Sequence, residues 1–347
     1  MARCNNKPTL LLLLQLHQLR LPLVLLLLLP LLPPPARAQT TYDVSASGDG
    51  GYGLSAAMAL AEPGDTISLA DGTYDSAVVS VRDGEAGSPI TVVGGPGAII
   101  NGEDSSRSVE ITHSFITLKG FSIQGKIGSS NTTGDYVDKC VYVGGPGMNS
   151  SSPLDGFVME GLFMENCGGE CVRLKNYVVN ANITGNTIEN CGIHDYAFAS
   201  TAKNGEGIYI GTSSNQWADA QGDSCDNNVV RGNHISTNAN ECVDIKEGST
   251  GNIVEDNFCS NQLDEDSGCY DSRGDGNIFR HNVGSHCVGA GVRLGGWEVD
   301  GHQFGVLNSV YGNDFSDVGN GAIKVVVSEQ GDICGNTCED GYCGLTG

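Results

Sequence analysis

Basic residues are scarce in this sequence. Lysine and arginine together number 18, against 41 aspartates and glutamates, which gives a formal net charge of −23. Proteins that bind nucleic acid need basic residues to neutralise phosphates, so the composition argues against a nucleic-acid partner. Any other polyanion would also be repelled, unless cations or a local group of basic residues offset the field.

Aromatic residues are scarce as well, at 6%, whereas glycine accounts for 50 of the 347 residues. This composition suits a long series of short turns better than layers of packed helices. One short helix is expected in GYGLSAAMALAEPGD, which ends at Pro63-Gly64, and β-rich stretches such as TISLADGTY and PITVVGGPGAII follow it. The sequence therefore favours a repeating β architecture.

The N-terminal segment has the pattern of a secretory signal. Residues 1–38 combine early basic residues, a leucine-rich run and the small-x-small site Ala36-Arg37-Ala38. We expect residues 1–38 to be removed, residues 39–347 to form a single secreted domain, and no membrane contact to remain after cleavage. Arg20 and Pro22 interrupt the run, and an uncleaved membrane anchor is the alternative.

Cysteine number and three sequons agree with a secretory route. Removal of Cys4 with the signal leaves 12 cysteines, an even number, as expected where an oxidising compartment pairs them. Sequons at Asn131, Asn149 and Asn182 fit glycosylation. Cysteines recur at equivalent positions of successive coils: one position is shared by Cys171, Cys242 and Cys269, and another by Cys167 and Cys191. Disulfides between successive coils are therefore predicted, without a fixed connectivity. Cys334, Cys338 and Cys343 are expected to tie down the last coil.

An asparagine recurs after an apolar and two variable residues from residue 160 onward. The asparagines are Asn186, Asn233, Asn257, Asn282, Asn313 and Asn336. Their spacings are mostly 23 to 31 residues, with one of 47 that must contain an insertion. A period in this range is typical of a solenoid.

A six-residue phrase repeats between the asparagines. Its copies are ECVRLK (170–175), EGIYIG (206–211), ECVDIK (241–246), GCYDSR (268–273), AGVRLG (290–295) and GAIKVV (321–326). The third and fifth residues are both aliphatic in five of the six copies, which indicates strands packed on one side. Parallel strands joined by turns predict an all-β solenoid, a parallel β-helix, in which the asparagines bond along the stack and the N-terminal helix caps the first coil.

The fourth and sixth residues of the phrase are expected to face outward as two columns. The fourth-position column is Arg173, Tyr209, Asp244, Asp271, Arg293 and Lys324, and the sixth-position column is Lys175, Gly211, Lys246, Arg273, Gly295 and Val326. With adjacent strands about 4.8 Å apart, Lys246 would lie beside Arg273, and the neighbouring cation would lower its pKa toward that of a useful base. The alternative is a solvated charge ladder in which Asp244 and Asp271 pair with these cations.

The stretch NECVDIKEGSTGNIVEDNFCSNQLDEDSGCYDSRGDGNIFRHN, followed by GAGVRLGG, resembles the core of polysaccharide lyase family 6. This family contains right-handed β-helix alginate lyases and chondroitinase B. The opening ADGTYDSAVVSVRDGEAGSPITVVGGPG resembles the family's first coils. By position, the resemblance implies that Lys246, which follows Glu241 at the family spacing, is the Brønsted base and that Arg273 assists proton transfer.

The resemblance also implies a calcium ion on acidic residues before the lysine. The family has a second glutamate where this chain has Ala239, so Glu206 and Asp244 are expected to join Glu241 as ligands. The alternative role of Glu206 and Glu241 is to accept hydrogen bonds from buried turn amides. The substrate-binding residues are expected to be Arg293, Lys175, Arg173, Lys324 and Tyr209.

Together these features predict a secreted, monomeric polysaccharide lyase that cleaves an anionic, uronate-containing polymer by β-elimination. Alginate, pectate and glycosaminoglycans all fit this class. A non-catalytic glycan-binding wall or matrix protein is one alternative, because a fold does not fix a chemistry. A hydrolase or C5-epimerase that uses Asp244 and Asp271 is another. Trp297 is expected either to stack on a sugar ring or to anchor a loop.

Overall fold

A computed structural model describes residues 37–47, 51–102, 106–145, 147–198, 204–217, 222–339 and 345–346. The predicted signal, residues 1–38, lies outside these ranges except for Arg37 and Ala38, and so does Cys343. No helix within the described ranges has both the length and the apolar character needed to cross a bilayer.

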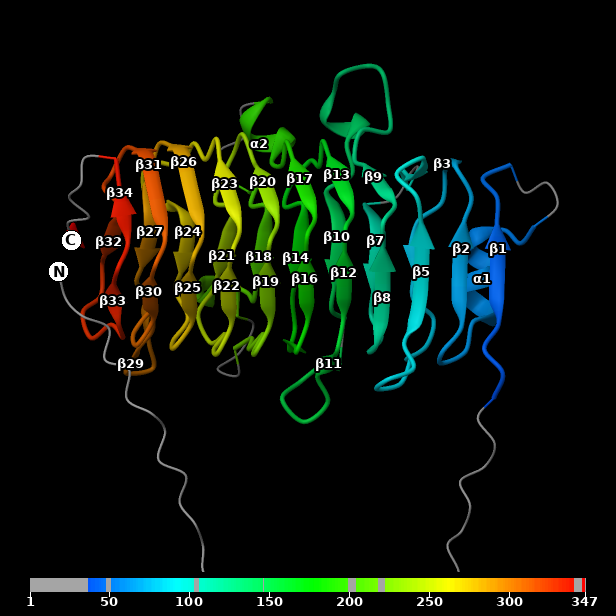
Figure 1. Cartoon of the computed structure of the whole chain (residues 1–347), viewed down its shortest axis with the longest axis horizontal. Helices are drawn as coiled ribbons and strands as arrows, with labels where there is room; N and C mark the ends of the chain where they lie inside the picture. Colours follow the sequence, from blue (N-terminus) through cyan, green and yellow to red (C-terminus); the bar gives the residue numbers. More distant parts are fainter. Residues whose placement is uncertain are drawn as a thin grey trace, which may run out of the picture.

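Three long parallel sheets wind into a right-handed parallel β-helix, as predicted (Figure 1). From β2 onward, each coil contributes one strand to each sheet in turn. Sheet 1 contains β1 (Thr41–Val44), β2 (Thr66–Leu69), β5 (Ile90–Gly94), β8 (Ile116–Lys119), β12 (Val158–Glu160), β16 (Asn182–Thr184), β19 (Val229–Arg231), β22 (Ile253–Glu255), β25 (Ile278–Arg280), β30 (Ser309–Tyr311) and β33 (Ile333–Cys334). Sheet 2 contains β3 (Gly72–Tyr74), β6 (Ala98–Ile100), β9 (Ser122–Gln124), β13 (Phe163–Glu165), β17 (Thr187–Glu189), β20 (His234–Ser236), β23 (Phe258–Ser260), β26 (Val283–Cys287), β31 (Asp314–Val318) and β34 (Thr337–Cys338).

Sheet 3 carries the repeated six-residue phrase. Its strands are β4 (Val78–Val79), β7 (Arg107–Ile111), β10 (Lys139–Val143), β14 (Val172–Leu174), β18 (Ile208–Ile210), β21 (Val243–Ile245), β24 (Gly268–Ser272), β27 (Ala290–Leu294), β32 (Ile323–Val325) and β35 (Leu345–Thr346). Two small pairs lie outside the three sheets: parallel β11 (Leu154–Asp155) with β15 (Val178–Val179), and antiparallel β28 (Glu298–Val299) with β29 (His302–Gln303).

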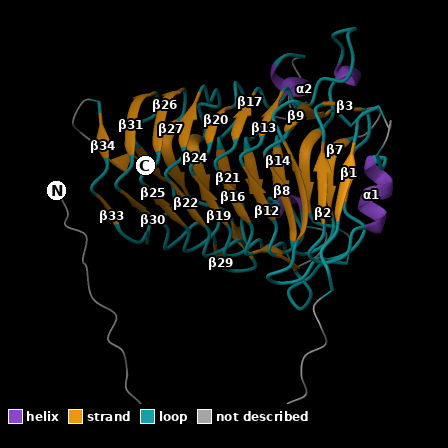
Figure 2. Ribbon diagram, turned by 45° about the vertical axis from the view of Figure 1, so that its right-hand side comes forward, coloured by secondary structure: helices purple, strands orange, loops and turns teal. Residues whose placement is uncertain are grey.

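The predicted N-terminal helix is α1 (Leu54–Leu60), at the start of the solenoid (Figure 2). Its buried residues Leu54, Ala57 and Met58 join the core, and it contacts β1 and β4. Because α1 covers the first coil, the coil is shielded from edge pairing with another chain. The remaining helical turns are short: α2 (Ile193–Tyr196) and the 3₁₀ turns Thr133–Asp135 and Ser214–Gln216.

The recurring asparagines form a buried ladder along the stack. Asn257 and Asn282 illustrate the pattern: the backbone N–H and the side-chain amide of Asn257 both donate to Oδ1 of Asn282, each at 3.0 Å. The Asn282 amide in turn donates to the Val254 carbonyl at 2.8 Å and to Asn313 at 3.0 Å. A second ladder, which the sequence analysis did not identify, runs through Asn228, Asn252, Asn277 and Asn308. Both ladders satisfy buried backbone groups at the turns.

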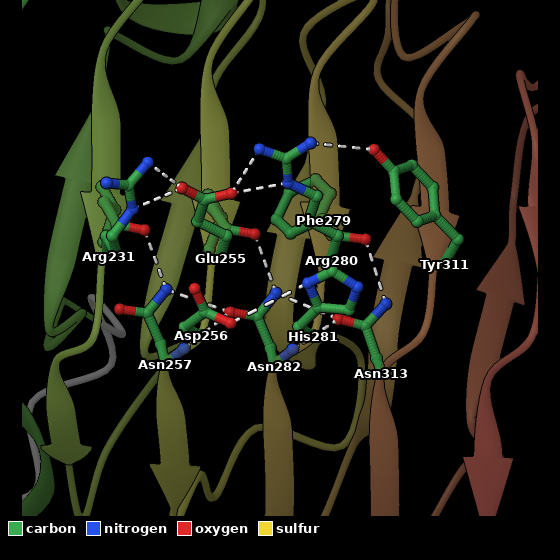
Figure 3. Close-up of polar contacts among 12 residues, drawn as sticks. Arg231, Glu255, Asp256, Asn257, Phe279, Arg280, His281, Asn282, Tyr311 and Asn313 are labelled. Atoms are coloured by element: carbon green, nitrogen blue, oxygen red, sulfur yellow. Dashed lines mark hydrogen bonds and ion pairs between the residues drawn. The ribbon is translucent and has the colours of Figure 1, made fainter.

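A ladder of charged residues crosses the outer face of sheet 1 above the asparagines (Figure 3). Glu255 pairs with Arg231 on one side and Arg280 on the other, and Arg280 donates to the Tyr311 hydroxyl at 3.2 Å. Burial raises the pKa of Glu255, but hydrogen bonds from the two arginines bring it below its ordinary value. These contacts connect four successive coils.

Four disulfides join successive coils, as predicted. They are Cys140–Cys167, Cys171–Cys191, Cys242–Cys259 and Cys269–Cys287, and each ties sheet 3 to the sheet 2 strand or turn of the next coil. Cys334 and Cys338 are also disulfide-bonded. The expectation that all twelve cysteines are paired is wrong, because Cys225 is a free, buried thiol. It lies in the 47-residue interval between Asn186 and Asn233, which contains the insertion.

Asp65 in the first coil has a strongly lowered carboxylate pKa. Two hydrogen bonds from the Arg37 guanidinium, each 2.6 Å, and backbone N–H donors of Thr40 and Glu62 lower the pKa of Asp65 from 3.8 to about 2. Arg37 belongs to the predicted signal, so cleavage after Ala38 would remove this pair.

Replacing Asn282 by alanine is expected to cost about 3 kcal/mol of unfolding free energy or more. The change removes the Oδ1 that accepts from the backbone N–H and the side-chain amide of Asn257, and each buried donor left unpaired costs about 1–3 kcal/mol. Denaturant unfolding measures this loss. His281→Asn is the matched control, since His281 is exposed, adjacent, and in a left-handed conformation that asparagine tolerates. Equal stability of the two variants would contradict a structural role for the ladder.

A chain beginning at Ala36 is expected to be slightly more stable near neutral pH than one beginning at Gln39, the effect being small because the Arg37 side chain is 47% exposed and solvent screens the pair. A depressed carboxylate pKa contributes stability above the unfolded value of 3.8, and this contribution is lost as the pH falls toward about 2. The difference in melting temperature should therefore vanish in acid. It should also be absent at every pH in Asp65→Asn, and a difference that persists there would refute the assignment to this pair.

Candidate functional site

The two columns of sheet 3 are in the predicted register. Backbone pairing aligns Arg173 with Tyr209, Tyr209 with Asp244, Asp244 with Asp271, Asp271 with Arg293 and Arg293 with Lys324. Backbone hydrogen bonds align the sixth column in the same way, with Lys246 between Gly211 and Arg273.

The expectation that these columns lie open to solvent is wrong for their centre. Asp244 and Asp271 are fully buried, and Lys246, Arg173 and Tyr209 are no more than 5% exposed. The side chains leave the solenoid core, but they pair with one another and with glutamates at the first position of the phrase. The result is a compact buried layer of charge on sheet 3.

Lys246 is held by the aspartate two residues before it. Its ammonium forms an ion pair with Asp244 and lies 4.6 Å from the ring centre of Tyr209. Burial lowers the pKa of Lys246, but attraction by Asp244 outweighs burial and the repulsion by Arg273, so the pKa lies above its ordinary value. Arg273 lowers this pKa as expected, but the expected net decrease toward the pKa of a useful base is wrong, because Asp244 has the stronger effect.

Tyr209 lies between the two cationic groups of the neighbouring coils. The Arg173 guanidinium stacks 3.6 Å from its ring centre, and the Lys246 ammonium is close to the same ring. Burial raises the pKa of Tyr209 to about 12, so the phenol keeps its proton at neutral pH. From the sequence, Tyr209 is expected only to bind substrate. The alignment of EGIYIG with ECVDIK was the signal that could have placed Tyr209 close to Lys246.

Arg273 and Arg293 flank Asp271. Arg293 donates to the Asp271 carboxylate at 3.1 Å and to the Gly295 carbonyl at 2.9 Å. Burial raises the pKa of Asp271, but the two arginines bring it below its ordinary value. Arg293 is thus engaged by Asp271 of the preceding coil and by Gly295 of its own coil, whereas the buried Nε of Arg273 has no hydrogen-bond partner.

Lys175 and Lys324 lie toward opposite ends of the columns. Lys175 is half-buried, and burial followed by repulsion from Arg173 lowers its pKa. Lys324 donates to the Asp266 carbonyl at 3.4 Å, away from the buried centre. The structure therefore brings together Arg173, Tyr209, Asp244, Lys246 and Arg273, with Arg293 beside them.

Three buried carboxylates lie next to Lys246. One oxygen each of Glu206, Glu241 and Asp244 lies within 4.8 Å of the others. Burial and repulsion from Glu170 raise the pKa of Glu206 to about 7. Burial and repulsion from Asp244 raise the pKa of Glu241 above its ordinary value. Glu206 accepts a hydrogen bond from the Gly205 N–H at 2.9 Å, as the turn-amide alternative requires, while Glu241 accepts one from the Ser267 hydroxyl.

The donor set of this cluster fits a hard cation. Oε2 of Glu241 and both carboxylate oxygens of Asp244 are buried and have no hydrogen-bond partner, although Asp244 makes the ion pair with Lys246. Buried carboxylate oxygens that face one another are the ligands that Ca²⁺ prefers. Ala239, the position of the missing glutamate, is fully buried and offers no ligand.

No protein-family model matches this chain. No curated protein matches it either. An alginate lyase from Paenibacillus sp. str. FPU-7 is similar in structure, with a TM-score of 0.70 and 23% identity over 89% of this chain and 98% of that one. The PL6 family alginate lyase AlyGC gives a TM-score of 0.54 and 17% identity, over 88% of this chain and 40% of that one.

Pectate lyase Pel9A is also similar, with a TM-score of 0.52 and 13% identity over 88% of this chain and 79% of that one. At these identities the similarity establishes the fold, and the three solved structures are those of polysaccharide lyases.

Calcium is expected to raise the melting temperature of the protein if the carboxylate cluster binds it. A ligand present at about 100 times its Kd adds roughly 2.7 kcal/mol to the unfolding free energy. Calorimetric titration and thermal unfolding, with and without chelator, measure the effect. Glu241→Gln should remove it and the exposed Asp256→Asn should not. Identical melting curves with calcium and with chelator would show that the cluster holds protons instead of a metal.

Proposed function

We propose that this protein is a secreted polysaccharide lyase that cleaves a uronate-containing polymer by β-elimination, and that it is a distant relative of polysaccharide lyase family 6. The observation that carries the proposal is the position of the Lys246 ammonium 4.6 Å from the Tyr209 ring centre on the neighbouring coil, inside a row of cations. Alginate, pectate and glycosaminoglycans are the candidate substrates.

The row of cations on sheet 3 suits a polyanionic substrate. After loss of residues 1–38 the chain would carry 14 basic and 41 acidic residues, which repels polyanions in general. Arg173, Lys175, Lys246, Arg273 and Arg293 offset this field along one sheet. We assign Lys175, Arg173, Arg293 and Lys324 to substrate carboxylates, which arginine can hold through two parallel hydrogen bonds.

β-Elimination needs one group that removes a proton and one that supplies a proton. In our proposal the Lys246 amine removes the proton from C5 of a uronate, the electron pair forms the C4–C5 double bond, and the C4–O bond breaks. The Tyr209 phenol donates its proton to the departing oxygen, and the Lys246 ammonium returns one to Tyr209. Arg273 assists by stabilising the negative charge that develops at the substrate carboxylate.

The same geometry explains why Lys246 must first lose a proton. Asp244 stabilises its ammonium form, so the amine is the minor form in the free protein. Glu206, Glu241 and Asp244 would hold a calcium ion, which when bound would neutralise the carboxylate next to C5 and make its proton more acidic.

A glycan-binding protein without catalysis is the second candidate. The low exposure of Lys246 and Tyr209, at most 5%, favours it, because a reacting sugar must reach both groups. A hydrolase or epimerase based on Asp244 and Asp271 is less well supported, since Lys246 and Arg293 already engage these carboxylates. We also propose secretion, glycosylation and a monomeric state, consistent with the sequence.

The first assay is incubation with polymannuronate, polyguluronate, polygalacturonate and dermatan sulfate while ultraviolet absorbance reports the new double bond. We expect absorbance to rise on at least one polymer, and Lys246→Ala and Tyr209→Phe each to lower kcat by about 100-fold or more, the range that general acid–base groups supply. Lys119→Ala is the control, because the Lys119 side chain is exposed and belongs to sheet 1, whereas the candidate site is on sheet 3. A flat trace from folded protein that a uronate column still retains would instead establish the binding protein.

A further inference from the structure

An antiparallel hairpin leaves sheet 3 beside Arg273. β27 ends at Leu294, and Gly295 then occupies the sixth column next to Arg273, with its N–H donating to the Ser272 carbonyl at 2.9 Å. The hairpin consists of β28 and β29 joined by Asp300 and Gly301, whose positive φ angles of 51° and 81° suit a tight two-residue turn. It therefore begins at the edge of the candidate site.

Several contacts fix the hairpin in place. The Asp275 carboxylate accepts hydrogen bonds from the backbone N–H groups of Gly305 at 2.8 Å and Val306 at 3.0 Å, and its other oxygen lies 2.7 Å from Nε2 of His302. Gln303 donates to the Gly296 carbonyl at 3.0 Å. The hairpin is thus a rigid extension of the turn that follows Arg273.

An aromatic contact ties the hairpin to a second loop near Lys246. Phe304 packs edge-on against Trp217, with ring centres 5.8 Å apart, and against His302 at 4.4 Å. The Trp217 indole donates to the Thr212 carbonyl at 2.9 Å and closely approaches Gly248, two residues after Lys246. The loop and the hairpin together border the turns that follow Lys246 and Arg273.

Trp297 is the aromatic residue of this border that remains open to solvent. It is 63% exposed, and among the described residues no large hydrophobic side chain is more exposed. Its carbonyl accepts the Phe304 N–H at 3.1 Å, which makes the two residues cross-strand partners whose side chains leave the same face of the hairpin. A rigidly held, exposed indole next to a row of cations suits a ligand with both apolar and anionic groups.

We propose that Trp297 is a sugar-stacking platform that binds the uronate polymer at a subsite on the Arg273 side of the reacting sugar and thereby helps to select the polymer. The inference rests on the proposed function, because it assumes a uronate chain on sheet 3. The C–H face of a pyranose ring packs on the indole, while the carboxylates of the chain face the cations of sheet 3. A sugar that presents an axial hydroxyl to the indole packs less well, so the platform discriminates between epimers.

The test measures oligosaccharide binding without turnover. Lys246→Ala protein is titrated with hexamers of mannuronate, guluronate and galacturonate, and binding is followed by calorimetry and by tryptophan fluorescence. The chain has two tryptophans, Trp217 and Trp297, and only Trp297 is largely exposed, so its environment dominates the change on binding. We expect Trp297→Leu to raise the Kd of the preferred hexamer by roughly tenfold and to abolish the fluorescence change.

Matched variants make the outcome specific. Trp297→Phe keeps an aromatic face and should stay within about threefold of the parent Kd, and Val81→Ala, 50% exposed in the first coils, should not change it. An unchanged Kd in Trp297→Leu would overturn the platform while the lyase proposal stands. Failure of the parent to bind any of the three hexamers, together with a flat lyase trace, would overturn both proposals.

Discussion

The register of the parallel strands in sheet 3 is the constraint on which the rest of the structure depends. Each coil places one residue of the six-residue phrase directly beside its equivalent in the next coil, as Tyr209 lies beside Asp244. A slip of one residue would turn Val243 and Ile245 outward and bring Asp244 into the core. The two asparagine ladders oppose such a slip, because each buried amide bonds to groups of both neighbouring coils.

Stacking in register turns a polar surface into a buried electrostatic network. Side chains about 4.8 Å apart along the stack cannot avoid one another, and opposite charges in neighbouring positions compensate their mutual burial. Glu170 pairs with Arg173 at 2.7 Å, and Arg293 pairs with Asp271 at 3.1 Å. Buried carboxylate oxygens without a hydrogen-bond donor occur at Glu241 and Asp244 beside Lys246, and this donor set fits the cation that we propose there.

Disulfides join successive coils on both sides of this network, but among the described residues none joins the coil of Tyr209 to the coil of Lys246. The second residue of the phrase is cystine-bonded in the coils of Cys171, Cys242 and Cys269. In the coil of Tyr209 this residue is Gly207, and the Ile235 side chain fills the space where a side chain would stand. Cys191 tethers the coil of Tyr209 to the preceding coil, whereas strand pairing and packing alone hold Tyr209 against Asp244 and Lys246 of the next coil.

The sequence by itself determined the repeat, the inward and outward alternation, the capping helix and the alignment of the columns. These follow from local periodicity, which a single strand already carries in its side-chain pattern. The second asparagine ladder, the disulfide partners and the free Cys225 were not determined, since they depend on which turns meet across coils. The sequence placed Lys246 next to Arg273, but it could not decide whether Arg273 or Asp244 has the stronger effect on the pKa of Lys246. Only the tertiary structure decided that Asp244 holds the ammonium and that Tyr209 lies against it, because electrostatic energies depend on distances and burial that the stacked coils create.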